Sequence, residues 1–200
     1  MRDRIREVFK GPGISPRPHA ARNVWPAPAD AIDGMLLRSA AVLVPLVDHE
    51  DGMTVLLTRR TDSLSAHAGQ ISFPGGGLEA SDASPEDTAL RETEEEIGIT
   101  RTQIELVGRL KAHDTRTGFR VLPVVGLLTP PLSTVPAPSE VASIFEVPLD
   151  FILDPANHRL EAHPDGGANR QYRAVPYGEH YIWGLTARVL FDLLHVVGKP

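Results

Sequence analysis

Residues 91–99 read Arg-Glu-Thr-Glu-Glu-Glu-Ile-Gly-Ile and close the most clearly delimited helix in the sequence. We predict that this helix covers residues 85–97. Ser84 is a favoured N-cap residue, Pro85 suits the first helical position, and Gly98 suits the left-handed residue that ends a helix. Because both ends are marked, the position of each glutamate around the helix axis is fixed.

Three of the four glutamates share one face of this helix. Glu92, Glu95 and Glu96 stand at i, i+3 and i+4, whereas Glu94 points elsewhere, toward solvent. Like charges at this spacing destabilise a helix by about 0.2–0.5 kcal/mol per pair. A divalent cation such as Mg²⁺ prefers oxygen ligands and would neutralise the cluster. The alternative is a solvated acidic face, but the glycine-rich loop at residues 75–77 favours a metal site.

A pair of strands precedes the glycine-rich loop. Residues 40–47 form a continuous apolar run, residues 48–52 a turn, and residues 53–59 a second strand, so together they predict a β-hairpin. Further strands are predicted over 70–73, 104–110, 119–128, 144–147, 159–163 and 170–175, and a closing helix over 185–197. This order of strands and helices indicates an α/β fold in which helices cover the faces of a mixed sheet.

The composition fits a single domain and excludes several classes of protein. The chain has 200 residues, of which 42% are hydrophobic and 23% charged, as in ordinary globular proteins. The net charge of -6 argues against a general nucleic-acid binder. The absence of cysteine excludes disulfides, cysteine-ligated zinc and thiol catalysis. Because the sequence has neither an apolar run of about 18 residues nor a signal peptide, we expect no membrane partner and a cytoplasmic location.

The glutamate helix and the loop before it resemble the Nudix box, G-x5-E-x7-R-E-U-x-E-E-x-G-U, in which U is apolar. The second half of the box is matched by Arg91, Glu92, Glu95, Glu96, Gly98 and Ile99, with Thr93 at an apolar position. In the first half, Gly76 is followed by Asp82 at the acidic position, and the interval to Arg91 is one residue longer than usual. This resemblance implies an α/β/α sandwich with a mixed β-sheet and metal-dependent hydrolysis of a pyrophosphate. It also implies that Mg²⁺ or Mn²⁺ is bound by Glu92, Glu95 and Glu96.

The longer interval is similar to that of the coenzyme A diphosphatase branch of the superfamily. That branch also carries the pattern L-L-T-x-R-(S/A)-x3-R-x3-G-x3-F-P-G-G. Matching residues at the same intervals are Leu56, Leu57, Thr58, Arg60, Gly69, Phe73, Pro74, Gly75 and Gly76. Thr61 and Ser65 depart from the pattern, and Ser65 replaces its second arginine. The resemblance implies that coenzyme A or a derivative is cleaved to 3′,5′-ADP and 4′-phosphopantetheine.

The resemblance assigns the catalytic roles to Arg91, Glu92 and Glu140. Glu92 belongs to the metal-binding face, and Arg91 would orient the carboxylates by charge-assisted hydrogen bonds or form an ordinary helix salt bridge. Glu140 follows a proline-rich loop over residues 129–139 and matches a glutamate of the coenzyme A branch. We expect it to act as a base or an additional metal ligand, the alternative being an ordinary residue at the start of a strand.

Four residues are candidates for binding the substrate. Gly75 and Gly76 would let the backbone approach metal or phosphate closely, although a tight turn before the helix also favours glycine. Arg60 is the first choice for the 3′-phosphate of coenzyme A, because it lies in the matching pattern. The other cations considered for that phosphate are Arg59, Lys111 and Arg116. His67 would contact a substrate phosphate or stabilise its own loop.

The residues before the matching region form a separate arm in this interpretation. We divide the chain into an N-terminal, proline-rich arm over residues 1–37 and a Nudix hydrolase domain over residues 38–200. Residues 1–10 are expected to form a short charged helix. The remainder of the arm is expected to pack on the domain or on a second subunit, which is compatible with a homodimer.

Two other functions are compatible with the same motifs. Hydrolysis of another nucleoside diphosphate derivative, such as ADP-ribose, would use the same helix, and Ser65 leaves this alternative open. The second is a Nudix-like binding domain without turnover. Such domains usually lose carboxylates of the box, whereas this chain keeps all three. In each case the expected partner is a small nucleotide and not a nucleic acid.

Overall fold

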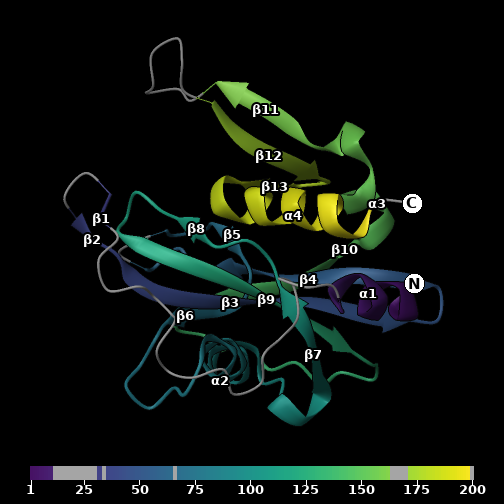
Figure 1. Cartoon of the computed structure of the whole chain (residues 1–200), viewed down its shortest axis with the longest axis horizontal. Helices are drawn as coiled ribbons and strands as arrows, with labels where there is room; N and C mark the ends of the chain where they lie inside the picture. The colour runs from purple at the N-terminus through teal and green to yellow at the C-terminus, as the bar shows by residue number, and fades with distance from the viewer. Residues whose placement is uncertain (11–30, 33–34, 65–66, 163–170, 199–200) are drawn as a thin grey trace.

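A mixed β-sheet crosses the middle of the computed structural model, which describes residues 1–10, 31–32, 35–64, 67–162 and 171–198 (Figure 1). Its strands are β3 (Arg38–His49), β4 (Gly52–Arg60), β5 (Ile71–Ser72), β6 (Gly75–Gly77), β7 (Ile104–Arg109), β8 (His113–Asp114), β9 (Phe119–Leu128) and β10 (Val141–Pro148). The order is β10-β4-β3-β9-β7, with β5 beside β4, β6 beside β3 and β8 beside β9. β3 and β9 run parallel, and the other pairs are antiparallel.

The central strand β3 explains why residues 40–47 are apolar without interruption. Successive side chains of a strand point to opposite faces of the sheet. Leu43 and Val47 join one buried cluster, and Val44 and Leu46 join the other. Both faces of β3 are therefore covered, and both need apolar side chains.

Helix α2 (Pro85–Ile97) covers one face of the sheet and has the predicted bounds. The Ser84 hydroxyl accepts a hydrogen bond from the Asp87 amide at 3.2 Å, and Gly98 has a φ of 75°. Thr93 is buried at the position where the Nudix pattern has an apolar residue, and its hydroxyl donates to the Ala89 carbonyl at 2.6 Å. The buried hydroxyl of Thr93 is therefore hydrogen-bonded within the helix.

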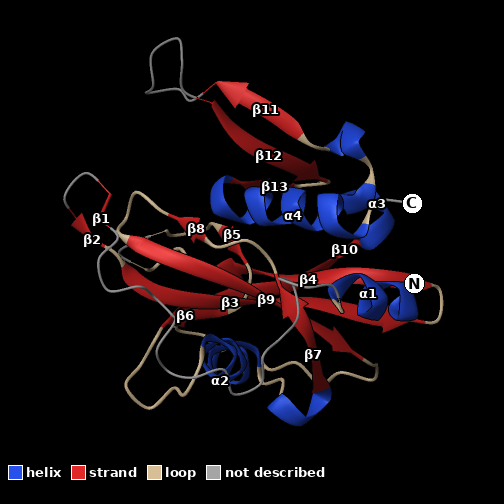
Figure 2. Cartoon of the chain, viewed as in Figure 1, coloured by secondary structure: helices blue, strands red, loops and turns tan. Residues whose placement is uncertain are grey.

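Helix α4 (Gly184–Val197) covers the opposite face, so the layers form the predicted α/β/α sandwich (Figure 2). The helices α1 (Arg2–Phe9) and α3 (Leu149–Leu153) lie on the same side. A second sheet packs on α4 and consists of β11 (Arg159–Ala162), β12 (Gln171–Tyr177) and β13 (His180–Trp183). The remaining elements are the strands β1 (Ala31–Ile32) and β2 (Met35–Leu36) and two short turns of 3₁₀ helix, Arg101–Gln103 and Pro155–Asn157.

The charged helix predicted for residues 1–10 is confirmed as α1, and it contributes to the main core. Ile5 and Phe9 are buried among residues of α4 and the sheet. Arg2 and Arg6 both donate to the Glu105 carboxylate on β7, at 3.1 and 2.7 Å. Most of the proline-rich arm, residues 11–30 and 33–34, lies outside the described residues, as does Ser65. No helix in the described ranges is both long and apolar enough to cross a membrane.

We expect Phe9→Ala to lower the free energy of unfolding by about 3–5 kcal/mol, because a buried aromatic side chain would be replaced by a cavity. Urea denaturation followed by circular dichroism measures the change. Glu7→Ala is the matched control, since Glu7 lies on the exposed side of the same helix. Equal stability of the two variants would show that α1 does not belong to the core.

Candidate active site

The short strand β6 joins the sheet to the loop before α2, and it consists only of glycine. Gly75 pairs with Val42 of β3 and has a φ of +154°, a conformation that favours glycine. A Cβ atom on Gly75 would collide with the backbone of Ala41 and Val42. Glycine at this position therefore allows β6 to lie directly against β3.

Gly76 makes room for the carboxylate of Glu92. A Cβ atom on Gly76 would overlap both carboxylate oxygens of Glu92, so this side chain rests on the bare backbone of β6. The side chain of Glu92 is only 16% exposed. Burial raises the pKa of Glu92, Arg91 lowers it, and the charges of Glu95 and Glu140 raise it further.

Glu96 is the most buried of the three glutamates, with 4% of its side chain exposed. Its carboxylate accepts a hydrogen bond from the Gly75 amide at 3.3 Å and lies 4.0 Å from Nη1 of Arg60. Burial, followed by the charge of Glu92, raises the pKa of Glu96 to about 8, although the Gly75 amide and Arg60 act in the opposite direction. The cluster thus holds more negative charge than its own cations neutralise.

Arg91 connects the loop to the helix. Its Nε and Nη2 donate to the two carboxylate oxygens of Asp82, each at 3.0 Å, and Nη2 also donates to the Gly77 carbonyl at 3.1 Å. Its Nη1 donates to Glu92 at 2.9 Å and to Glu95 at 3.1 Å. Burial opposes the ionisation of Asp82, but Arg91, the Glu79 amide and the Thr88 hydroxyl outweigh it and hold the pKa of Asp82 below its ordinary value.

Glu140 reaches the cluster through the proline-rich loop. The Ala137 amide donates to the Glu96 carbonyl at 2.8 Å, and the Thr61 amide donates to the Glu140 carbonyl at 3.0 Å. The loop is therefore fastened both to the end of α2 and to the end of β4. The charge of Glu140 raises the pKa of Glu92 and of Glu96, so its carboxylate lies in their neighbourhood.

The structure brings most of the predicted site residues together. The group around α2 and β6 comprises Arg60, Gly75, Gly76, Arg91, Glu92, Glu95, Glu96 and Glu140. No hydrogen bond or ion pair among the described residues joins His67 to this group; its Nδ1 lies 2.9 Å from Oε1 of Gln70. Sequence reasoning missed the role of Asp82 as the anchor of Arg91, although its spacing after Gly76 had marked its position.

The carboxylates are the hard oxygen ligands that Mg²⁺ and Mn²⁺ prefer. Within the described ranges, no three acidic or imidazole side chains stand ready as a complete metal site. The hydrogen bonds explain why, since Glu92 and Glu95 turn toward Arg91 while Glu96 turns toward Gly75. The glycine backbone beneath Glu92 and the raised pKa of Glu96 nevertheless fit a cation at this cluster.

Comparison with known proteins agrees with this geometry. A model of the NUDIX domain matches residues 37–171, which is more than half of the chain. The chain belongs to the Nudix family. Two similar Nudix hydrolases, both named NudL, come from Photorhabdus laumondii and Citrobacter koseri. The first is 44% identical over 80% of this chain and 85% of its own length, and the second is 41% identical over 80% and 83%.

These relatives identify the chain as a Nudix pyrophosphohydrolase, and Nudix hydrolases generally use divalent metal ions. A MutT/nudix family protein from Enterococcus faecalis has a similar fold, with a TM-score of 0.56 and 19% identity. The similarity covers 86% of this chain and 66% of that protein. The predicted Nudix fold is confirmed.

We expect Gly76→Ala to keep the fold and to displace the Glu92 carboxylate, because the new Cβ meets the mobile end of a side chain. Mn²⁺ affinity, measured by calorimetry, should fall about tenfold or more, as when the groups that orient metal ligands are lost. Gly77→Ala is the matched control, since a Cβ there meets nothing within 4 Å. Equal Mn²⁺ affinity of the two variants would contradict the proposed contact.

The raised pKa of Glu96 predicts a pH-dependent stability in the presence of a chelator. The folded state favours the protonated carboxyl of Glu96. The contribution of this carboxyl to the free energy of unfolding is therefore complete below a pH of about 4.5 and is lost as the pH rises through about 8. Urea unfolding should therefore show the wild type losing stability relative to Glu96→Gln across this range. Parallel stability curves for the two proteins between pH 4.5 and pH 8 would disprove the shift.

Proposed function

We propose that this Nudix hydrolase cleaves the pyrophosphate bond of coenzyme A or its derivatives, giving 3′,5′-ADP and 4′-phosphopantetheine. The coenzyme A branch is supported by the sequence pattern that runs from Leu56 to Gly76 and by the longer interval between Asp82 and Arg91. The observation that carries the chemistry is the placement of Glu92 and Glu96 over a glycine backbone, with Arg60 beside Glu96. A small nucleotide in the cytoplasm is the substrate in this proposal, and a homodimer stays an expectation from the sequence.

Glu92, Glu95 and Glu96 would hold the divalent cation. They stand on adjacent turns of α2, and two of them are within reach of one guanidinium, which keeps their carboxylates close together. When bound, Mg²⁺ or Mn²⁺ supplies charge neutralisation on the pyrophosphate and lowers the pKa of water. The buried position of Glu96 excludes bulk solvent from one side of the site.

Arg60 is suited to bind the pyrophosphate itself. Its Nε is buried and has no hydrogen-bond partner among the described residues, and its Nη1 faces Glu96 at 4.0 Å. A buried donor without an acceptor is unfavourable, and a phosphate oxygen would satisfy it. Because Arg60 lies beside Glu96, we assign it to the phosphates of the scissile bond, and not to the 3′-phosphate that the sequence pattern suggested.

Hydrolysis needs one proton acceptor and one bond cleavage. Water adds to one phosphorus, the bond from that phosphorus to the bridging oxygen breaks, and the other phosphate leaves with the bridging oxygen. The carboxylate of Glu140 is the candidate acceptor of the water proton, because it lies near Glu92 and Glu96 and is itself exposed. Arg91 is a positioning residue, since it contacts the carboxylates and is anchored by Asp82.

The decisive experiment compares products from coenzyme A, ADP-ribose and a nucleoside triphosphate, with Mg²⁺ or Mn²⁺, by mass spectrometry. We expect rapid release of 3′,5′-ADP from coenzyme A and a loss of about a hundredfold or more in Glu96→Gln, which removes a ligand. Glu94→Gln is the matched control, because Glu94 is exposed on the same helix outside the cluster.

The other outcomes are equally informative. Preferential cleavage of ADP-ribose would keep the Nudix chemistry and overturn the coenzyme A assignment. Turnover of none of these compounds would favour a Nudix-like domain that binds nucleotides without cleaving them. Equal activity of Glu96→Gln and Glu94→Gln would remove Glu96 from the proposed mechanism.

A further inference from the structure

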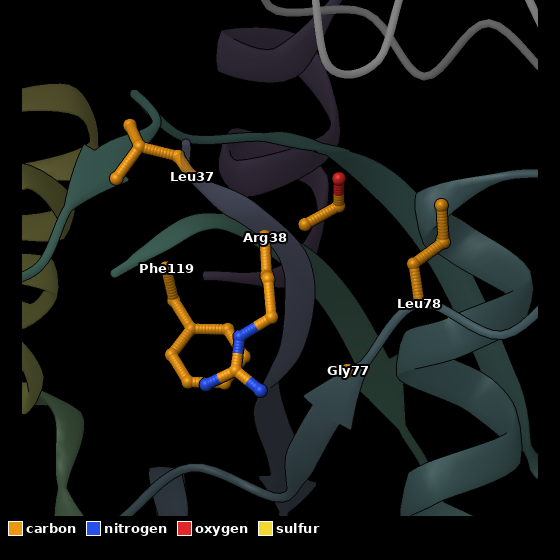
Figure 3. Close-up of a pocket in the computed structure, with 6 residues that line it drawn as sticks. Leu37, Arg38, Gly77, Leu78 and Phe119 are labelled. Atoms are coloured by element: carbon orange, nitrogen blue, oxygen red, sulfur yellow. The ribbon is translucent and has the colours of Figure 1, made fainter. Parts of the chain in front are cut away.

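A pocket of about 400 Å³ lies at the beginning of β3, beside β6 and β9 (Figure 3). This volume is within the range of small-molecule sites. Its lining combines a cation, a hydroxyl, an aromatic ring and apolar side chains, which are contributed by Leu37, Arg38, Ser39, Gly77, Leu78 and Phe119. Apart from Gly77, whose carbonyl accepts a hydrogen bond from Arg91, none of these residues has a role in the proposed cleavage of the pyrophosphate.

The guanidinium of Arg38 lies over an aromatic ring. Its guanidinium carbon lies 4.1 Å from the centroid of the Phe119 ring, and the two residues are paired in the parallel register of β3 and β9. Stacking uses the face of the guanidinium and leaves the N–H groups in its plane available. Among the described residues, no carboxylate or carbonyl accepts a hydrogen bond from this side chain. Within the described part of the chain, this group is therefore an oriented cation without an anion.

The other cations near the site are already engaged or lie elsewhere. Arg59 donates to both carboxylate oxygens of Asp62 at 3.1 Å, and Arg60 faces Glu96. Lys111 and Arg116 are exposed and do not line the pocket. Of the arginines and lysines weighed for an additional phosphate, none combines an oriented side chain, a free donor edge and a pocket as Arg38 does.

The pocket adjoins the carboxylate cluster across the edge of β6. Gly77 forms part of its wall, whereas the preceding Gly76 carries the Glu92 carboxylate, and consecutive Cα atoms are only about 3.8 Å apart. By the register of β3 and β6, Arg38 and Gly77 face the same side of the sheet, and Gly76 faces the other. Because β6 consists of glycine alone, this strand itself places no side chain between the two sites.

We propose that this pocket binds a second phosphate group of the substrate, a phosphomonoester on the nucleotide end, through the guanidinium of Arg38. The inference rests on the proposed function, since the pyrophosphate must lie at Glu92 and Glu96 on the other side of β6. A phosphomonoester matches the planar donor edge of arginine, and Ser39 adds a hydroxyl to the lining. In coenzyme A the corresponding group is the 3′-phosphate, which dephospho-coenzyme A lacks.

The test compares kcat/KM for coenzyme A and for dephospho-coenzyme A. The wild type should prefer coenzyme A, and Arg38→Gln should reduce that preference about tenfold or more while leaving dephospho-coenzyme A almost unaffected, as expected for one charged hydrogen-bond partner. Arg159→Gln, an exposed arginine of the separate sheet, is the control and should keep the preference. An unchanged preference in Arg38→Gln, or an equal loss in Arg116→Gln, would overturn the proposal.

A binding measurement separates this inference from the proposed function. Calorimetry with 3′,5′-ADP and 5′-AMP needs no turnover, and the wild type should bind 3′,5′-ADP more tightly by a margin that Arg38→Gln removes. If coenzyme A is not cleaved but this margin exists, the pocket is supported and the proposed function fails. If coenzyme A is cleaved without discrimination against dephospho-coenzyme A, the proposed function stands and the pocket proposal fails.

Discussion

The site depends on the close approach of the β6 backbone to two neighbours. On one side Gly75 lies against β3 at a distance that no Cβ would permit, and on the other Gly76 lies against the carboxylate of Glu92. The backbone of β6 therefore sets the distance between β3 and the acidic face of α2. Because β6 has no side chains, the Glu92 carboxylate rests directly on its backbone. The hydrogen bond from Arg91 also holds this carboxylate.

This spacing creates an imbalance of charge. Arg91 donates to Glu92 and Glu95, whereas the partners of Glu96 among the described residues are the Gly75 amide and a guanidinium 4.0 Å away. A buried carboxylate with so little compensation is unfavourable when ionised, and this is why its pKa rises to about 8. The same environment favours a divalent cation, which adds positive charge where the protein supplies too little. The high energy of ionised Glu96 and the suitability of this cluster for a cation thus have one physical origin.

The sequence predicted the parts of this arrangement that are encoded locally. The bounds of α2 followed from Ser84, Pro85 and Gly98, and the acidic face followed from helical spacing. The contact of Gly76 with Glu92 was beyond reach, because it depends on how β6 pairs with β3. The place of Arg60 beside Glu96 and the burial of α1 also depend on contacts between distant segments, which no local pattern records. The strand β13 was missed although it pairs with β12 across a short local turn at Gly178 and Glu179.

Arg91 contacts both the loop before α2 and the carboxylates that we propose as metal ligands. Its Nε and Nη2 hold Asp82 and the Gly77 carbonyl, whereas its Nη1 alone contacts Glu92 and Glu95. The two carboxylates can therefore leave Nη1 while the other edge of the guanidinium keeps the loop in place. The low pKa of Asp82 ensures that this anchor stays ionised when the charge of the cluster changes. The longer interval between Asp82 and Arg91 does not prevent their pairing, because the residues of the loop lie before the helix, which begins at Pro85.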